Sequence, residues 1–223
     1  MEKKDFSHLE AVERLFVARH RFKMLSSVLF EILELNEQKK AFVNSHFFKT
    51  AYRQDSCQLL LDTMINYEVA QICRIWDGVD YTGFSIPTIA DLLQGDDVRR
   101  ELVPEESGST VAFNPHKREF IDAVFDEAVA EAIKVSQSDE MVRIKTYRNK
   151  RIAHPIYRTR EEKKKSVTSI QPEDIEYAVE NAFRIVEVLE SALSLSSSNF
   201  GQVRVQASRT LEEFYGGLRI NEN

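Results

Sequence analysis

The sequence has few of the residues that interrupt helices or build cross-linked folds. Only 7 of its 223 residues are Gly and 5 are Pro, below the usual shares of about 7% and 5%. Scarce backbone breakers favour long helices, so composition predicts an all-α fold. Cys57 and Cys73 are too few for a disulfide framework, and we expect both to be buried thiols.

Several classes of protein lack their signatures in this chain. No run reaches the ~18 apolar residues of a membrane span, and the first residues lack the apolar core of a signal peptide, so we expect a cytoplasmic protein with no membrane partner. No Gly-rich phosphate loop or Gly-x-Ser-x-Gly elbow supports a nucleotide hydrolase or an esterase. The histidines outside one central segment are scattered, so we expect no metal and no cofactor; they are His8, His20, His46 and His116.

The remaining composition is that of a folded protein, with 43% hydrophobic and 30% charged residues. A chain of this length buries roughly 70% of its unfolded surface. We expect one helical domain over residues 1–223, with an insertion of short helices and loop over about 79–117 and a C-terminal extension over about 196–223.

Apolar periodicity and capping residues predict the helices. Ser7 and Glu10 have the spacing of a capping box for a long first helix over about 7–35. Gln171 and Pro172 are expected to start another helix. Ser138 is the expected N-cap of a helix that ends at His154, because Pro155 disfavours α geometry in the residue before it. Further helices are expected over about 36–52 (a shorter helix or a packed corner), 54–76, 81–103 (one or two short helices) and 116–135, with a final short helix containing Leu211, Phe214 and Tyr215.

The negative net charge of −6 hides a basic island. Residues 143–165 hold ten Lys and Arg against two Glu, a net charge of +8, while the rest of the chain carries −14. A local site for a polyanion follows from this distribution. For Lys163, Lys164 and Lys165 a solvated basic loop is the simpler explanation.

The island contains the segment Arg148-Asn149-Lys150-Arg151-Ile152-Ala153-His154-Pro155. Arg offers a fixed fork of donors for phosphate oxygens, and His exchanges a proton near neutral pH. A neutral His could take the proton of a ribose 2′-hydroxyl while Arg neutralises charge on the phosphoryl oxygens, and this scheme needs no metal. In a continuous α-helix Arg148 and His154 would lie about 120° apart, and both could border one cleft.

This segment resembles the motif of the HEPN superfamily, in which Arg, a polar residue and a short gap precede a His near a helix end. The Arg-Asn-Lys and Ala-His-Pro forms are especially similar to the abortive-infection members of the AbiU kind. Arg74-Ile75-Trp76-Asp77 also resembles that subgroup, and an ion pair between Arg74 and Asp77 is possible across the helix surface.

The resemblance implies a helical HEPN-like bundle that homodimerises with both motifs at the interface. It also implies a metal-independent endoribonuclease that leaves 2′,3′-cyclic phosphate ends and acts as a toxin or phage-defence effector, with an antitoxin protein as a further partner. Arg148 would stabilise the transition state, His154 would be general base or acid, and Asn149 would orient the phosphate or the partner His. The residues expected to bind RNA are Lys145, Lys150, Arg151 and Arg158.

One position departs from the family pattern. Toxin members that are paired with nucleotidyltransferase antitoxins have a Tyr two residues after the His, where this chain has Ile156, with Tyr157 one residue further on. Other functions stay open. Arg148 and His154 could cap a solvated helix end, the chain could be a noncatalytic helical module that binds RNA, nucleotide or protein, or it could be a structural dimer or antitoxin-like partner.

Overall fold

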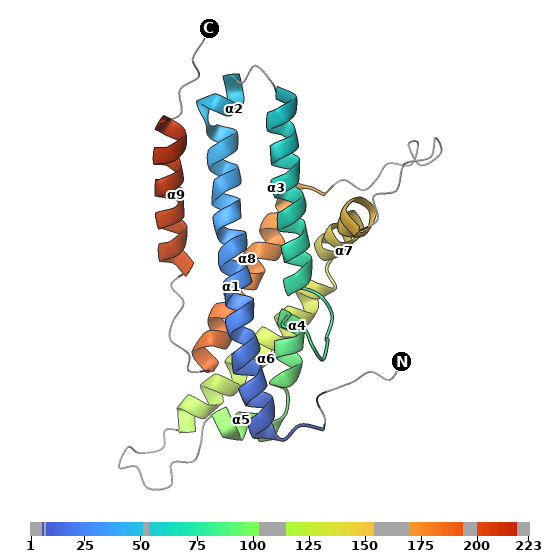
Figure 1. Ribbon diagram of the computed structural model, residues 1–223. Helices are drawn as coiled ribbons and strands as arrows, with labels where there is room; N and C mark the ends of the chain where they lie inside the picture. The colour runs from blue at the N-terminus through green and yellow to red at the C-terminus, as the bar shows by residue number, and fades with distance from the viewer. Residues whose placement is uncertain are drawn as a thin grey trace.

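The computed structural model describes residues 6, 8–50, 54–102, 115–153, 170–193 and 200–217, and in these ranges the chain is helical with no strand. The predicted all-α bundle is confirmed. The long helices stand side by side in an elongated bundle that has a short helix at each end (Figure 1). The elements are α1 (Ala11–Asn44), α2 (His46–Thr50), α3 (Gln54–Ile75), α4 (Ile86–Leu92), α5 (Asp96–Leu102), α6 (Pro115–Ser136), α7 (Asp139–Tyr147), the π-helix η1 (Arg148–Ala153), α8 (Pro172–Ala192) and α9 (Phe200–Gly217).

The first helix begins later and ends later than its pattern predicts. It starts at Ala11, where Glu10 is the N-cap and its backbone N–H donates to the Glu13 carboxylate at 3.1 Å. The predicted start at Ser7 is therefore wrong, because a second capping box three residues on takes its place. The helix then continues to Asn44, and the shorter helix expected after residue 36 is reduced to the five residues of α2.

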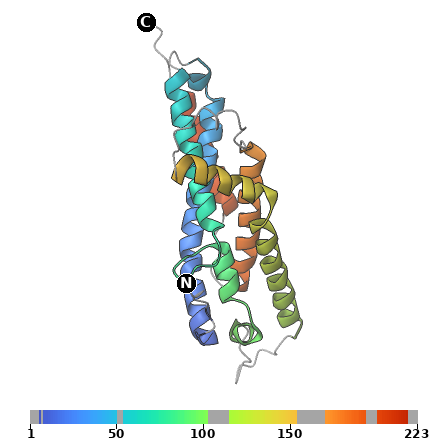
Figure 2. The same cartoon turned by 90° about the vertical axis from the view of Figure 1, so that its right-hand side faces the viewer.

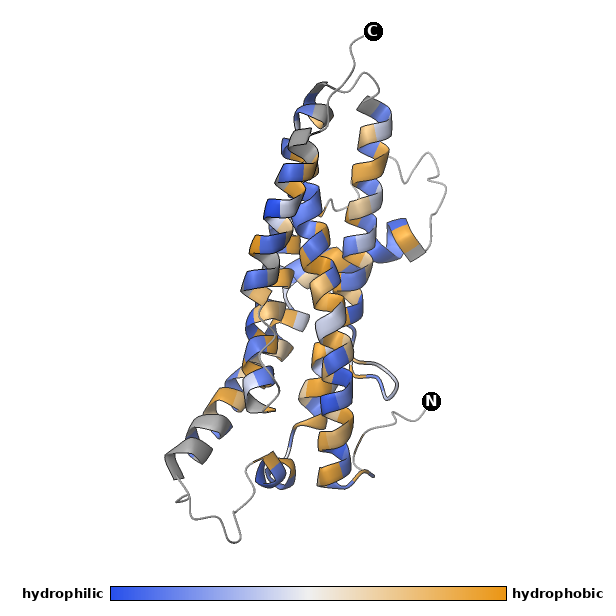
Figure 3. Ribbon diagram, turned by 60° about the vertical axis from the view of Figure 1, so that its left-hand side comes forward, coloured by the Kyte–Doolittle hydropathy of each residue, from blue (hydrophilic) through white to orange (hydrophobic). Residues whose placement is uncertain are grey.

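The core lies where α1, α3, α4, α6 and α8 meet. Trp76, Phe22 and Phe125 are its largest fully buried side chains among the described residues. The Trp76 indole N–H donates to the backbone carbonyl of Ala178 at 3.1 Å, so the end of α3 is bound to α8. Figure 3 shows hydrophobic and hydrophilic residues alternating around the long helices, the amphipathic pattern from which they were predicted.

Both short helices of the predicted insertion are present, as α4 and α5. Ser85 caps α4 by accepting from the Thr88 backbone N–H, and Ile86, Ile89 and Leu92 are fully buried in the common core. The division into one domain with an insertion stays a prediction.

The final helix is longer than the short one expected. Phe200, at the start of α9, packs on Phe30 of α1 and Phe183 of α8, with ring centroids 4.6 and 5.2 Å apart. Figure 1 shows α9 running beside α1, on the opposite side of the bundle from α7.

Candidate active site at the end of α7

Helix α7 starts where the sequence predicts and lies across the long helices (Figure 2). The Ser138 hydroxyl is its N-cap and accepts from the Met141 backbone N–H at 3.2 Å. Met141 and Ile144 are fully buried and attach the helix to the core. The Tyr147 hydroxyl at its end donates to the side-chain oxygen of Asn66 on α3 at 2.9 Å. Helix α7 is thus held at both of its ends, and this fixes where the next segment begins.

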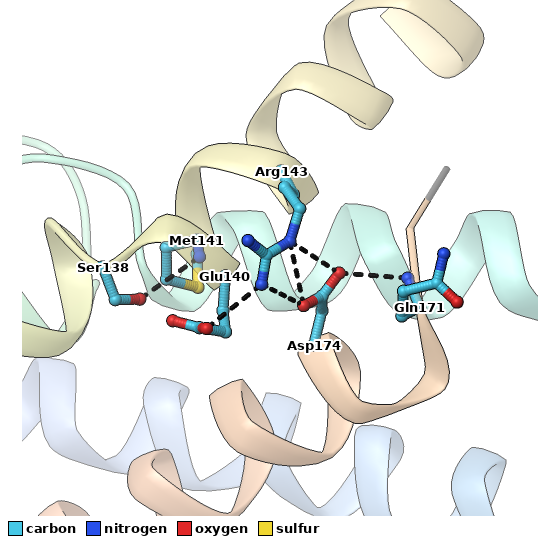
Figure 4. Close-up of polar contacts among 6 residues, drawn as sticks. All are labelled: Ser138, Glu140, Met141, Arg143, Gln171 and Asp174. Atoms are coloured by element: carbon cyan, nitrogen blue, oxygen red, sulfur yellow. Dashed lines mark hydrogen bonds and ion pairs between the residues drawn. The ribbon is translucent and has the colours of Figure 1, made fainter. Parts of the chain in front are cut away.

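The first arginine of the basic island belongs to the fold. Arg143 donates to both oxygens of Asp174 at distances of 2.6 to 3.1 Å and to Glu140 at 3.1 Å (Figure 4). Asp174 also accepts the Gln171 backbone N–H at 3.0 Å, which caps α8. Hydrogen bonds from Arg143 hold the pKa of Asp174 below its usual range. The positive charge of Arg143 is therefore largely compensated by the carboxylates of Asp174 and Glu140.

The motif segment is not the continuous α-helix predicted from Ser138 to His154. From Arg148 to Ala153 the backbone is a π-helix, whose bonds join residues five apart. Tyr147 and Ile152 both pack against the core. In an α-helix they would lie about 140° apart, whereas the wider turn brings positions five apart to one side. The angle of 120° predicted between Arg148 and His154 assumed α geometry and does not apply.

The wider turn leaves the cations of the segment outside the core. Lys150, Arg151 and Asn149 are exposed, and Lys145 and Arg148 are half-buried. An α-helix would have continued the buried Met141 and Ile144 stripe onto positions 148 and 151. Single π-turns within helices are frequent at functional sites, and this one coincides with the Arg-Asn pair.

Arg148 is held by two acceptors. Its Nη1 donates to Oδ1 of Asp77 at 3.0 Å, and its Nε donates to the Asn149 side-chain oxygen at 3.2 Å. Within the described part of the chain Nη2 has no hydrogen-bond partner. One nitrogen of the guanidinium thus remains available to an incoming anion.

The contact with Asp77 replaces the ion pair considered between Arg74 and Asp77, which is absent from the described residues. The Arg74 guanidinium instead lies over the Phe84 ring, 4.5 Å from its centroid. Helix α3 ends at Ile75, so Asp77 is beyond the helix and turns toward η1. No local sequence signal indicates this contact of Asp77, because the two residues are 71 positions apart and meet only in the fold.

Both cysteines are buried free thiols, as predicted. Burial raises the pKa of the Cys73 thiol to about 11, and the nearby Arg148 partly opposes that rise. Cys73 stays protonated near neutral pH and is a packing residue beneath the arginine.

His154 and Arg158, predicted as catalytic and RNA-binding residues, lie outside the described residues, as do Ile156 and Tyr157. Of the predicted site, the structure therefore describes Lys145, Arg148, Asn149, Lys150 and Arg151.

Two further observations concern metals and membranes. The described residues contain no group of three or more His, Cys, Asp or Glu side chains that could hold a metal ion. Among the helices that could be searched, none has the length and apolar character needed to cross a membrane.

A helical bundle with an Arg-Asn pair at the end of a late helix agrees with the HEPN class whose motif the sequence resembles. A family model described as AbiU2, of the HEPN group, matches residues 8–214, and the chain belongs to this family. Neither the curated proteins nor the solved structures contain a match to this chain.

Proposed function

We propose that this protein is a metal-independent endoribonuclease of the HEPN type that leaves 2′,3′-cyclic phosphate ends on RNA. The observation that carries the proposal is the Arg148-Asn149 pair of an AbiU2-family chain, set on a π-turn with one guanidinium nitrogen that has no partner among the described residues. The protein acts in the cytoplasm as a toxin or phage-defence effector. It works as a homodimer, and an antitoxin protein is a further partner.

The reaction follows from the residues of the motif. His154, as general base, takes the proton of a ribose 2′-hydroxyl, and the 2′-oxygen forms a bond to the adjacent phosphorus. The bond from phosphorus to the 5′-oxygen breaks, and the imidazolium returns a proton to that oxygen. Arg148 donates to the phosphoryl oxygens, where negative charge builds in the transition state. Asn149 keeps the guanidinium in place or contacts the phosphate itself.

The other cations bind the RNA backbone. Lys150 and Arg151 are exposed beside Arg148, and Lys145 is half-buried one turn before it. Arg158 completes the predicted set. These contacts are electrostatic and independent of base identity, so they set affinity and not cleavage sequence.

The test is cleavage of a labelled RNA in excess EDTA, with the products identified by mass spectrometry. A cyclic phosphate end is lighter by one water than a linear phosphate end. We expect cleavage by the wild-type protein, loss of about 10²–10⁴-fold in His154→Ala, and no cleavage of the all-deoxy oligonucleotide. His20→Ala is the matched control, because His20 is an exposed histidine on α1.

Cleavage that persists in His154→Ala would remove that residue from the mechanism. Cleavage of the deoxy strand would exclude attack by the 2′-hydroxyl.

A noncatalytic RNA-binding module is the second candidate, favoured by the exposed Lys150 and Arg151. It predicts salt-sensitive RNA binding without any product in the same assay.

A further inference from the structure

The segment Arg74-Ile75-Trp76-Asp77 spans the end of α3 and is attached to the rest of the bundle. Trp76 is fully buried and is hydrogen-bonded to Ala178 of α8 at 3.1 Å. The Arg74 guanidinium lies over Phe84. Asp77 follows Trp76, so its backbone begins at a fixed position. Its carboxylate lies toward η1.

The carboxylate holds one edge of the Arg148 guanidinium. Asp77 accepts from Nη1 and Asn149 accepts from Nε, so two of the three nitrogens of a planar group are fixed. Fixing two nitrogens fixes the plane, and the direction of Nη2 is then determined. Asn149 is the adjacent residue on the same turn, whereas Asp77 ties the guanidinium to a separate part of the fold.

Stability is a weak reason for this contact. The Asp77 side chain is 50% exposed and the Arg148 side chain 29% exposed, and ion pairs in contact with solvent contribute little to folding. A carboxylate beside a site for a polyanion also repels the ligand. Orientation of the Arg148 guanidinium therefore explains the contact better than stability does.

We infer that Asp77 is a positioning residue, which holds Arg148 so that Nη2 meets the phosphoryl oxygen of the RNA. The inference rests on the function proposed above and deepens it. Holding a catalytic group in its reacting geometry before the substrate arrives lowers the barrier, and a displacement of about 1 Å can cost about a hundredfold in rate.

The test compares Asp77→Asn with Asp77→Glu. We expect Asp77→Asn to lower the single-turnover cleavage rate at saturating RNA about tenfold to a hundredfold. Its Kd for an uncleavable 2′-deoxy analogue should stay equal or become tighter, because a repelling charge is removed. Asp77→Glu should recover most of the rate. The control is Asp97→Asn, since Asp97 also has a half-exposed side chain, 57% exposed, and pairs with an arginine, Arg14, at 3.6 Å.

A cleavage rate in Asp77→Asn that equals or exceeds the wild-type rate would overturn the inference, and an increase would identify the contact as inhibitory. A loss of RNA affinity in proportion to the rate, or a loss of helical content in Asp77→Asn, would also overturn it, because either result indicates a binding or folding role.

Nuclear magnetic resonance separates this inference from the proposed function. The Nε–H signal of Arg148, assigned by its loss in Arg148→Lys, should be sharp in wild-type protein and in Asp77→Glu. It should broaden through faster motion and solvent exchange in Asp77→Asn. If wild-type protein cuts no RNA, the proposed function fails, while this signal still decides whether Asp77 orders the guanidinium; an unchanged signal in Asp77→Asn means that it does not.

Discussion

Arg143 and Arg148 lie five positions apart in the same basic island, and each pairs with a carboxylate from a distant part of the chain. The Asp174 side chain is 4% exposed and accepts three hydrogen bonds from Arg143, whereas the Asp77 side chain is 50% exposed and accepts one from Arg148. The first arginine connects α7 to the capping turn of α8 through a buried carboxylate, and the second connects η1 to the half-exposed carboxylate of Asp77.

The difference shows that a count of charges gives a poor measure of a binding site. Both arginines add equally to the net charge of +8, yet a ligand that displaced the carboxylate would disturb a buried helix cap at Arg143 and only a half-exposed contact at Arg148. The two arginines differ in the burial of the partner carboxylate and in the number of hydrogen bonds that this carboxylate accepts.

The strongest way to break this comparison is to remove each arginine in turn and measure RNA cleavage. Arg148→Ala should lower the rate about 10²–10³-fold, since it removes a donor to the transition state. Arg143→Ala should keep most of the activity at a temperature where it remains folded. Equal losses in the two variants, with both proteins folded by circular dichroism, would mean that the two cations are not distinct.

Stability should respond in the opposite order. Asp174→Asn weakens the cap of α8 and its bonds to Arg143, so the free energy of unfolding should fall by about 1–2 kcal/mol. Asp77→Asn should lower it by less than about 0.5 kcal/mol. Urea unfolding followed by circular dichroism measures both, provided the slope with urea is unchanged. A larger fall in Asp77→Asn would give that residue a structural role.

A fall in pH should give a further test of the contact between Arg143 and Asp174. The pKa of Asp174 is lowered by Arg143, so its contribution to stability is present above the ordinary carboxyl pKa of about 4 and is lost as the pH falls through the lower folded value. Wild-type protein should therefore lose stability below about pH 4 more steeply than Asp174→Asn. Parallel curves of urea midpoint against pH for the two proteins would contradict this.

The smallest effect is expected at the exposed cations. Lys150→Gln and Arg151→Gln should each reduce by about 1 the slope of log affinity against log salt for an uncleavable RNA. Arg143→Gln should leave that slope unchanged, because its charge is already paired with Asp174. Fluorescence anisotropy at several salt concentrations measures the slope, and an equal reduction in all three variants would assign Arg143 to the RNA surface.

Local signals in the sequence predicted most of the helices. Gln171, Pro172 and the apolar stripe behind them gave α8, and Ser138 gave the start of α7. The start of α1 lies at Ala11 and not at Ser7, because a capping box at Glu10 and Glu13 satisfies the backbone N–H groups of these two residues.

The geometry of the site could be predicted only in part. The residue types from Arg148 to Arg151 indicate a site. The π-turn depends on the spacing of five between Tyr147 and Ile152, and this spacing has a meaning only once the core that both residues contact is known. The partner of Arg148 needed the fold, because Asp77 meets it through a tertiary contact and both residues have closer neighbours of opposite charge in sequence.

Trp76 is the only tryptophan of the chain, and it immediately precedes Asp77. Its indole is fully buried and bonded to Ala178. The protein thus carries an intrinsic fluorophore one residue from the carboxylate that holds Arg148. Its emission arises from one buried environment. A spectral shift on mixing with RNA therefore reports a local rearrangement where the end of α3 meets α8, and no label has to be attached.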